Sequence, residues 1–254
     1  MSHHIVEAKE LHYSYPDGTK ALNGINFRIT HGESVAIVGE NGAGKSTLLL
    51  HSVGYLLPTE GYLQIGDCQV SKSTLATVRQ SVGMVFQDPD DQLFMPTVID
   101  DVAFGPLNMG IPSENALKIA VNALATVGME HLLKRPPYKL SAGEKRAVAI
   151  AGVLAMSPGI LVLDEPSSNL DPQARRRLIN LLKTFSHTKI VATHDLDMAM
   201  DLCERTIIIH EGHLAADGST ADIFKNQKLL ERCGLEQPLS MQACPTCKKP
   251  PMPT

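Results

Sequence analysis

One nine-residue segment limits the folds open to this chain more than any other feature. It reads Gly39-Glu40-Asn41-Gly42-Ala43-Gly44-Lys45-Ser46-Thr47 and fits the pattern G-x-x-x-x-G-K-[ST]. The apolar run 35–38 precedes it and a leucine-rich stretch follows, so we expect it between a buried strand and a helix. Glycines let successive backbone N–H groups turn inward around phosphate oxygens, and the helix directs its positive end at the same anion. The segment therefore predicts a nucleotide-binding loop.

Composition excludes several other classes of protein. The chain has 254 residues, of which 43% are hydrophobic and 20% charged, and a formal net charge of -4. These values are typical of globular proteins and give no sign of a nucleic-acid binder driven by charge. The longest apolar run, 147–156, is too short for a membrane-spanning helix, and the N-terminus has no signal-peptide pattern. Five scattered cysteines favour a reducing cytoplasm over a disulfide framework.

Polar residues follow four short apolar runs, each at the point where the run stops. The runs 35–38, 82–86, 160–163 and 190–193 are followed by Gly39, Gln87, Asp164 and His194, respectively. Ligands of open parallel sheets bind outside the carboxyl ends of the strands, so these four ends should form one site. In this pattern the Lys45 ammonium group places a positive charge at the β and γ phosphates, and the Ser46 hydroxyl can bind Mg²⁺.

The acidic pair after the third run has two readings. Asp164-Glu165 could simply mark a strand leaving the core. Beside a phosphate-binding loop, however, Asp164 can hold a metal and Glu165 can accept a proton from water. Neighbouring residues of a strand point in opposite directions, so two adjacent acids can do two different jobs.

The order of the elements predicts an α/β protein with an insertion. Strands are expected at 11–15 and 25–29 around a turn at 16–18, which together would form an antiparallel layer. Helices are expected at 98–104, 113–127 and 142–156, separated by Pro106, Pro112 and Pro136-Pro137. We therefore expect a core of residues 1–87 and 159–225, a helical subdomain of 88–158 and a short, partly flexible tail of 226–254.

The segment Leu140-Ser141-Ala142-Gly143-Glu144 opens the last of these helices. Ser141 and Glu144 have the spacing of a capping box, and most such boxes only cap a helix. A second role is compatible with capping, because a hydroxyl can accept from a backbone N–H and donate to a phosphate.

The motifs together resemble the ATPase subunits of ATP-binding-cassette (ABC) transporters. The resemblance covers residues 5 to about 225 and includes six motifs in the family's order: the phosphate-binding loop (P-loop), Gln87, Leu140 to Glu144, Asp164-Glu165, Ser168-Asn169-Leu170-Asp171 and His194. It implies a P-loop NTPase core with a parallel sheet, an N-terminal antiparallel β layer and a helical subdomain insertion. It also implies a head-to-tail dimer of identical subunits, with two ATP molecules and Mg²⁺ at the interface.

The resemblance assigns a role to each motif. Glu165 would be the catalytic base, His194 would hold the γ-phosphate and the attacking water, and Gln87 would sense metal and water. Lys45 and the rest of residues 39–47 would bind the phosphates, and Ser46, Gln87 and Asp164 would hold Mg²⁺. Tyr15 would stack on adenine. Ser141 and Gly143 would contact the γ-phosphate bound to the other subunit, and Asp171, also a predicted helix N-cap, would lie at the interface.

Two residues depart from the family's usual signature. The family has Gly-Gly-Gln where this chain has Ala142-Gly143-Glu144. Because Gly143 is retained, close approach to a phosphate should be preserved. Ala142 adds a methyl group and Glu144 adds a negative charge, and hydrolysis is expected to survive both changes.

The segments 85–94, 96–98 and 101–108 resemble the energy-coupling-factor (ECF) branch, and most closely the cobalt and nickel importers of the CbiO and NikO type. This resemblance implies an ATP hydrolase at the cytoplasmic face of the cell membrane that powers uptake of cobalt or nickel. Its partners would be an integral membrane coupling protein, whose short helices bind near Gln87 and residues 98–104, and a small membrane protein that captures the substrate. A vitamin importer of the same branch is the alternative.

Other functions fit the sequence less well. A soluble ABC ATPase acting on nucleic acid or ribosomes usually has two cassettes or a long coiled insertion. A regulator without turnover would lack the base or the histidine, whereas both Glu165 and His194 are present.

A few residues outside these motifs could have roles of their own. Cys244 and Cys247 could bind zinc if two tails met, and His3 and His4 could bind Ni²⁺ or Cu²⁺. We expect the tract Arg175-Arg176-Arg177 to be a solvated helix face.

Overall fold

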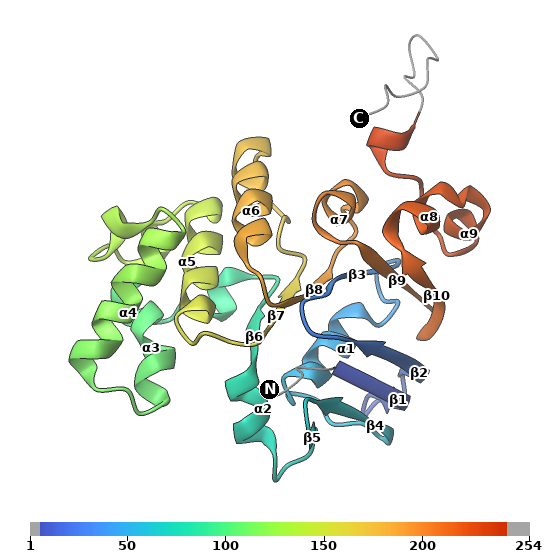
Figure 1. Ribbon diagram of the computed structural model, residues 1–254, viewed down its shortest axis with the longest axis horizontal. Helices are drawn as coiled ribbons and strands as arrows, with labels where there is room; N and C mark the ends of the chain where they lie inside the picture. Colours follow the sequence, from blue (N-terminus) through green and yellow to red (C-terminus); the bar gives the residue numbers. More distant parts are fainter. Residues whose placement is uncertain (1–5, 243–254) are drawn as a thin grey trace.

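The main sheet of the protein is mostly parallel and brings the predicted strand ends together. The computed structural model describes residues 6–242. Its six-stranded sheet has the order β10-β9-β3-β8-β7-β6, in which only β10 runs antiparallel to its neighbour (Figure 1). The strands are β3 (Ser34–Val38), β6 (Val82–Val85), β7 (Ile160–Asp164), β8 (Thr188–Ala192), β9 (Arg205–His210) and β10 (His213–Ser219).

Both faces of this sheet are covered, which explains why its strands read as continuous apolar runs. In β3, Val35 and Ile37 belong to one hydrophobic cluster, with α1 (Lys45–Ser52) and the antiparallel strands. Ala36 and Val38 belong to a second cluster, formed with helices of the opposite face. Those helices are α5 (Ala142–Leu154), α6 (Pro172–Thr184), α7 (Leu196–Leu202) and α8 (Thr220–Lys225).

The predicted N-terminal layer is a separate four-stranded antiparallel sheet with the order β2-β1-β4-β5. Its strands are β1 (Val6–Ser14), β2 (Lys20–Ile29), β4 (Glu60–Ile65) and β5 (Cys68–Gln69). The expected turn at 16–18 joins β1 to β2, with Gly18 at a φ of 88° and the Asp17 carboxylate accepting from the Thr19 N–H. The turn leaves Tyr15 directly after β1.

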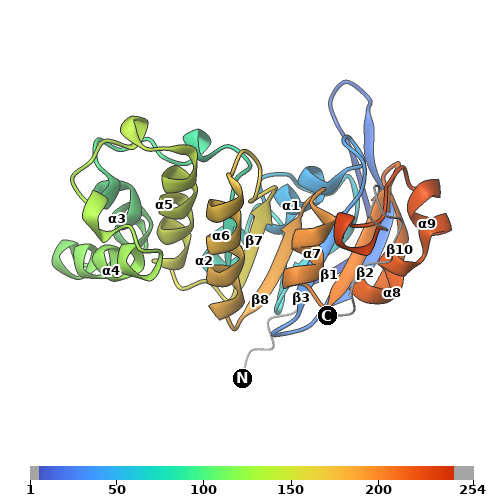
Figure 2. The same cartoon turned by 90° about the horizontal axis from the view of Figure 1, so that it is seen from above.

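The expected helical insertion consists of α3 (Val98–Asn108), α4 (Ser113–Thr126) and α5, which pack around their own apolar cluster. Figure 2 shows these three helices at one end of the molecule and α8 and α9 at the other. One prediction is wrong: Pro106 does not end the first helix but lies inside α3, which continues to Asn108. Pro106 is buried, and since it lies in the last turn its missing N–H costs a single helical hydrogen bond.

Several connecting elements complete the described residues. They are α2 (Leu75–Ser81) and the short 3₁₀ turns at Pro89–Asp91, Glu130–Leu132, Pro137–Lys139 and Leu239–Met241. Of the predicted tail, residues 226–242 are folded: α9 (Gln227–Arg232) packs on the core through the fully buried Leu230. The candidate metal residues His3, His4, Cys244 and Cys247 lie outside the described residues. Within residues 6–242, every helix is too short or too polar to span a bilayer.

The strand β7 offers a test of how strongly the sheet core stabilises the fold. Leu161 is fully buried within the helix-covered face, so Leu161→Ala should lower the free energy of unfolding by about 2–5 kcal/mol, measured by urea denaturation. Leu117, on the exposed side of α4, is the control, and its alanine variant should differ from the parent by about 0.5 kcal/mol or less. Equal effects of the two changes would contradict this assignment of the core.

Candidate functional site

The loop between β3 and α1 is built so that only glycine fits at two of its positions. Gly44 caps α1 with a φ of 109°, and a Cβ there would lie 2.5 Å from the Ala21 carbonyl oxygen. A Cβ on Gly39 would lie 2.1 Å from the Ile209 carbonyl oxygen. Close backbone approach from β2 and β9 therefore selects both glycines, in addition to the need for inward-facing N–H groups.

Lys45 is the first residue of α1, and its side chain is buried inside this loop. Its Nζ donates to the carbonyl oxygens of Gly39 and Glu40 at 2.8 and 2.9 Å. Burial lowers the pKa of Lys45 from its ordinary value, and the carboxylates of Glu165 and Asp164 act in the opposite direction. The loop thus holds a cationic group where the pattern requires a phosphate ligand.

A cleft of about 590 Å³ brings most of the predicted site residues together. Its lining includes Tyr15, residues of the P-loop, Gln87, Glu165 and His194. The hydroxyl groups of Tyr15 and Thr47 lie 2.9 Å apart, within hydrogen-bonding distance, a contact that the sequence pattern did not predict. Tyr15 also packs edge-on against Tyr13, at 5.0 Å between ring centroids.

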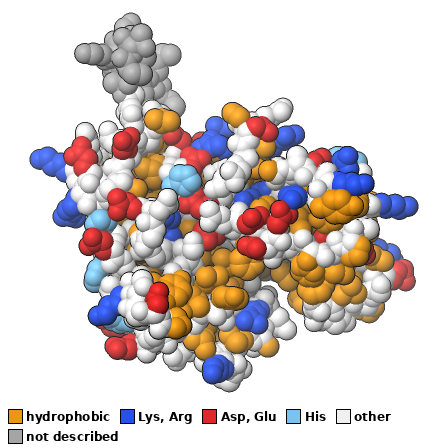
Figure 3. Space-filling model, turned by 180° about the vertical axis from the view of Figure 1, so that it is seen from behind, with side chains coloured by type: hydrophobic (Ala, Val, Ile, Leu, Met, Phe, Trp, Pro, Cys, Tyr) orange, Lys and Arg blue, Asp and Glu red, His pale blue; other side chains and the backbone are white. Residues whose placement is uncertain are grey.

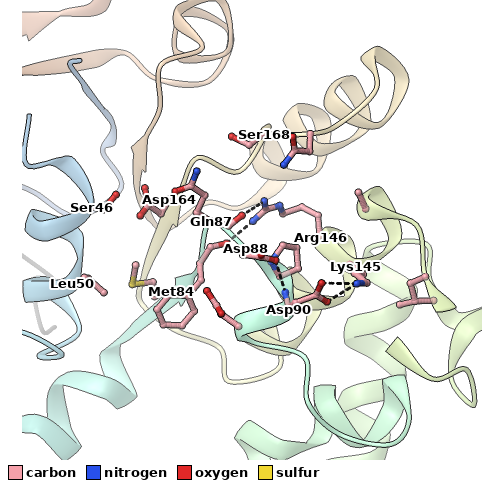
Figure 4. Close-up of a pocket in the computed structure, with 16 residues that line it drawn as sticks. Ser46, Leu50, Met84, Gln87, Asp88, Asp90, Lys145, Arg146, Asp164 and Ser168 are labelled. Carbon is pink, nitrogen blue, oxygen red and sulfur yellow. Dashed lines mark hydrogen bonds and ion pairs between the residues drawn. The ribbon is translucent and has the colours of Figure 1, made fainter. Parts of the chain in front are cut away.

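An adjoining cleft of about 580 Å³ contains three residues that could hold a divalent cation. Ser46, Gln87 and Asp164 face one another across it (Figure 4). Asp164 Oδ1 is buried and has no hydrogen-bond partner, and burial raises the pKa of this carboxyl, against the effect of the Ser46 hydroxyl. A hydroxyl, an amide and a carboxylate oxygen suit Mg²⁺, and a cation would satisfy the orphaned oxygen. The residues present therefore fit this metal.

Glu165 and His194 meet at the ends of β7 and β8. Glu165 adopts a φ of 44°, a left-handed conformation that is costly for a residue with a side chain. Its Oε2 lies 2.8 Å from His194 Nδ1 and accepts from the Thr193 hydroxyl and the His194 N–H, both at 3.3 Å. The carboxyl is 7% exposed, whereas the imidazole is 65% exposed. The pair thus has a shielded proton acceptor and a ring open to the cleft.

Arg146 is a site residue that the sequence analysis missed. It lies on α5, is buried, and donates to the carbonyl oxygens of Phe86 and Gln87 at 2.6 Å each (Figure 4). The guanidinium therefore fastens the helical subdomain to the strand end that carries Gln87. An arginine one turn inside a predicted helix has no local signal for this contact.

The signature residues do not line the P-loop cleft. Ser141 caps α5, and its predicted capping box with Glu144 is present. Glu144 Oε2 accepts from the Ser141 N–H at 2.7 Å and from its hydroxyl at 2.9 Å, and these bonds lower the pKa of Glu144. The carboxylate is thus used by the cap, a role that accounts for its presence. Gly143 lies close to the start of α6, where a Cβ added to it would be 3.3 Å from Ala174 Cβ.

Asp171 is the N-cap of α6, as predicted. One oxygen of its carboxylate accepts from the N–H groups of Gln173 and Ala174 at 2.9 Å. Asp171 does not line the P-loop cleft either. The interface roles of Ser141, Gly143 and Asp171 stay predictions.

A third hollow is an apolar groove between the core and the helical subdomain. It measures about 770 Å³ and is formed by α2, β6, α3 and α5. Phe94 and Phe104 lie at its rim, 62% and 40% exposed, with ring centroids 4.9 Å apart. Figure 3 shows hydrophobic side chains gathered over the helical subdomain and the neighbouring face of the core.

Comparison with known proteins finds relatives that match over most of the chain. Residues 22–168 match the family model described as ABC transporter. A Geobacter sulfurreducens relative, whose name is that of an ABC transporter ATP-binding protein, is 65% identical over 97% of this chain and 99% of its own length. The energy-coupling factor transporter ATP-binding protein EcfA of Methanothermobacter thermautotrophicus is 46% identical over 92% of this chain and 77% of its own.

The solved structure of CbiO1 from Clostridium perfringens, part of the ABC transporter complex CbiONQ, has a TM-score of 0.80 and 41% identity. It covers 91% of this chain and 94% of the CbiO1 chain.

The steric demand on Gly44 generates a test of the loop. Gly44→Ala should abolish or strongly weaken ATP binding, because its methyl group would clash with the Ala21 carbonyl and displace the start of α1. Gly128→Ala is the matched control, since Gly128 also has a positive φ but has open space around its Cβ position and lies away from the nucleotide cleft. Titration with a fluorescent ATP analogue measures both. If Gly44→Ala bound ATP as the Gly128 variant does, the described loop geometry would be wrong.

Proposed function

Because the chain belongs to the ABC transporter family as an ATP-binding subunit that couples ATP hydrolysis to transport, we propose that it energises an ECF-type importer. The observation that carries this proposal is the convergence of Lys45, Glu165 and His194 on one cleft at the ends of adjacent strands. The named EcfA relative and the CbiO1 structure support assignment to this branch.

The proposed chemistry follows from the positions of the polar groups. Lys45 and the N–H groups of the P-loop bind the β and γ phosphates, and Tyr15 stacks on the adenine at the far end of the cleft. Glu165 accepts the proton of the attacking water, since its carboxylate is shielded and directed at His194. His194 holds the γ-phosphate and orients the water.

Mg²⁺ fits the oxygen ligands of Ser46, Gln87 and Asp164. When bound, it would neutralise charge that develops on the phosphate oxygens. Gln87 lines both clefts, so the same side chain can respond to the metal and to the attacking water. Its backbone is tied to α5 by Arg146, which supports a role in reporting nucleotide state to the helical subdomain.

A second ATPase subunit, in our proposal an identical chain, completes the site. Ser141 and Gly143 of one subunit would contact the γ-phosphate held by the other, with Asp171 at the interface. One observation supports this: Ser141 is exposed although it caps α5. Its hydroxyl, which donates to Glu144 in this structure, would turn its single proton to the phosphate when the two subunits meet. A related cassette from the solved structures, MJ0796, which is 30% identical with a TM-score of 0.77 over 85% of this chain and 98% of its own, is dimeric with ADP and Pi.

The apolar groove is the proposed docking site for an integral membrane coupling protein. Exposed aromatic rings at the rim of a groove are typical of surfaces that take an amphipathic helix. The groove shares Phe86, Asp91 and Met84 with the lining of the magnesium cleft, so a docked helix would lie beside Gln87. The ATPase would then be peripheral, at the cytoplasmic face of the membrane.

Cobalt or nickel is the proposed substrate, captured by a separate small membrane protein. The likeness of residues 85–108 to the cobalt and nickel branch supports a metal substrate. The alternative is a vitamin, for which the EcfA relatives leave room.

Replacing the proposed base separates turnover from binding. Glu165→Gln keeps the side chain's shape but cannot accept a proton, so the ATPase rate should fall about 10²–10⁴-fold while ATP affinity is retained. Glu114→Gln, an exposed change on α4, should have the same ATPase rate as the parent.

In cells lacking this subunit, the parent chain should restore nickel or cobalt content, measured by elemental analysis, and Glu165→Gln should not. Full turnover by Glu165→Gln would refute the catalytic assignment, and unchanged metal content would favour vitamin uptake.

A charge in the groove tests docking. Phe94→Asp should release the subunit from membranes that contain its partners, because a carboxylate at the rim opposes burial against an apolar helix. Tyr138→Asp is the control: Tyr138 is 75% exposed but lies outside the groove. Membrane flotation followed by quantification of the bound subunit gives the readout, with ATP binding as a check of folding. Equal retention of both variants would exclude this docking surface.

A further inference from the structure

Arg175 does not belong to a solvated helix face, in contrast to the expectation from its sequence tract. It lies in the first turn of α6, and its side chain is only 23% exposed. Its Nε and Nη2 donate to the two carboxylate oxygens of Asp195 at 2.6 and 2.8 Å. This two-pronged geometry is the strongest form of a carboxylate–guanidinium contact.

Asp195 follows His194 directly in the chain, and four groups hold it. Besides Arg175, the Ser167 hydroxyl donates to Oδ2 at 3.3 Å and the Met198 N–H donates to Oδ1 at 2.9 Å, which caps α7. The Asp195 N–H in turn donates to the Thr193 hydroxyl at 3.0 Å. Burial acts to raise the pKa of Asp195, but the bonds from Arg175 and Met198 outweigh it and the pKa is lowered.

The contacts of Asp195 connect it to Glu165, the residue proposed as the catalytic base. Thr193, which is fully buried, donates through its hydroxyl to Glu165 Oε2 at 3.3 Å. Ser167 lies on the loop that leaves Glu165 for α6. The carboxylate of Asp195 therefore joins the segment after Glu165 to the segment that carries His194, and Arg175 supplies its only full positive charge within residues 6–242.

A second ion pair between α6 and α7 serves as a comparison, because it has no contact with the residues next to His194. Arg176, the next residue, donates to Asp201 Oδ2 at 2.7 Å, so it also links α6 to α7. Asp201 lies in the last turn of α7, whereas Asp195 begins that helix. The two ion pairs thus join the same two helices, and only the first contacts a neighbour of His194.

We propose that Arg175 is a positioning residue for ATP hydrolysis, which acts through Asp195 to hold His194 and Glu165 in their catalytic arrangement. This inference rests on the hydrolytic roles proposed above for those two residues. Arg175 itself does not line the nucleotide cleft, so it orients the reacting groups without touching the nucleotide. Misplacing reacting groups by about an ångström can cost on the order of 10²-fold in rate.

The test compares steady-state ATPase kinetics of the full-length chain with Arg175→Ala and Arg176→Ala. Arg175→Ala should lower kcat by about tenfold to a hundredfold and leave the KM for ATP within about twofold, since the phosphate and adenine contacts are untouched. Arg176→Ala should leave both constants within about twofold of the parent. Arg175→Lys keeps the charge but not the fork, and should restore kcat only in part.

A double-mutant cycle tests whether Arg175 acts through Asp195. Asn is also a good N-cap, so Asp195→Asn retains the cap of α7 but weakens the pair with Arg175. The effects of Arg175→Ala and Asp195→Asn on kcat should be strongly non-additive. Three outcomes would overturn the proposal. The two changes could have additive effects on kcat, Arg175→Ala and Arg176→Ala could have the same kcat, or Arg175→Ala could lower kcat/KM only by raising KM. If Glu165→Gln kept full turnover, the proposed catalytic roles would fail instead.

Discussion

Parallel pairing of β3, β8, β7 and β6 is the constraint on which the rest of the structure depends. Ile37 pairs with Ala192, Leu163 with Val191 and Val85 with Leu163, so all four strands end at one edge within a residue or two. The P-loop and Glu165 directly follow β3 and β7, Asp164 is the last residue of β7, and His194 and Gln87 lie two residues beyond β8 and β6. Backbone pairing therefore aligns these groups before any side chain contributes.

The helical subdomain is tied to this edge through polar contacts rather than apolar packing alone. Arg146 reaches the carbonyl groups of Phe86 and Gln87, and Lys145 pairs with Asp90 at 2.6 Å. Asp90 is exposed, so water screens its pair with Lys145, whereas the buried guanidinium of Arg146 would be costly to leave unpaired. Arg146 thus joins the backbone at Gln87 directly to α5, and the apolar groove lies beside this connection.

The sequence predicted those features that depend on local pattern. Strand ends, the P-loop, the capping box of Ser141 and Glu144 and the N-cap of Asp171 all follow from residues close together in the chain, and the structure contains each of them. It failed where tertiary packing outweighs local preference, as at Pro106 inside α3. Contacts between distant residues, such as Tyr15 with Thr47 and Arg146 with Phe86, leave no periodic trace and could not be predicted.

The tract Arg175-Arg176-Arg177 shows why a run of like charges is not one structural unit. Successive residues of a helix point about 100° apart, so three adjacent arginines cannot share one environment. Arg175 faces the beginning of α7 and pairs with the half-buried Asp195, while Arg176 pairs with Asp201 in the last turn of α7 and Arg177 is exposed. Screening by water weakens the Arg176 pair more than the Arg175 pair. The same tract thus contains a solvated charge and one that is structurally linked to His194.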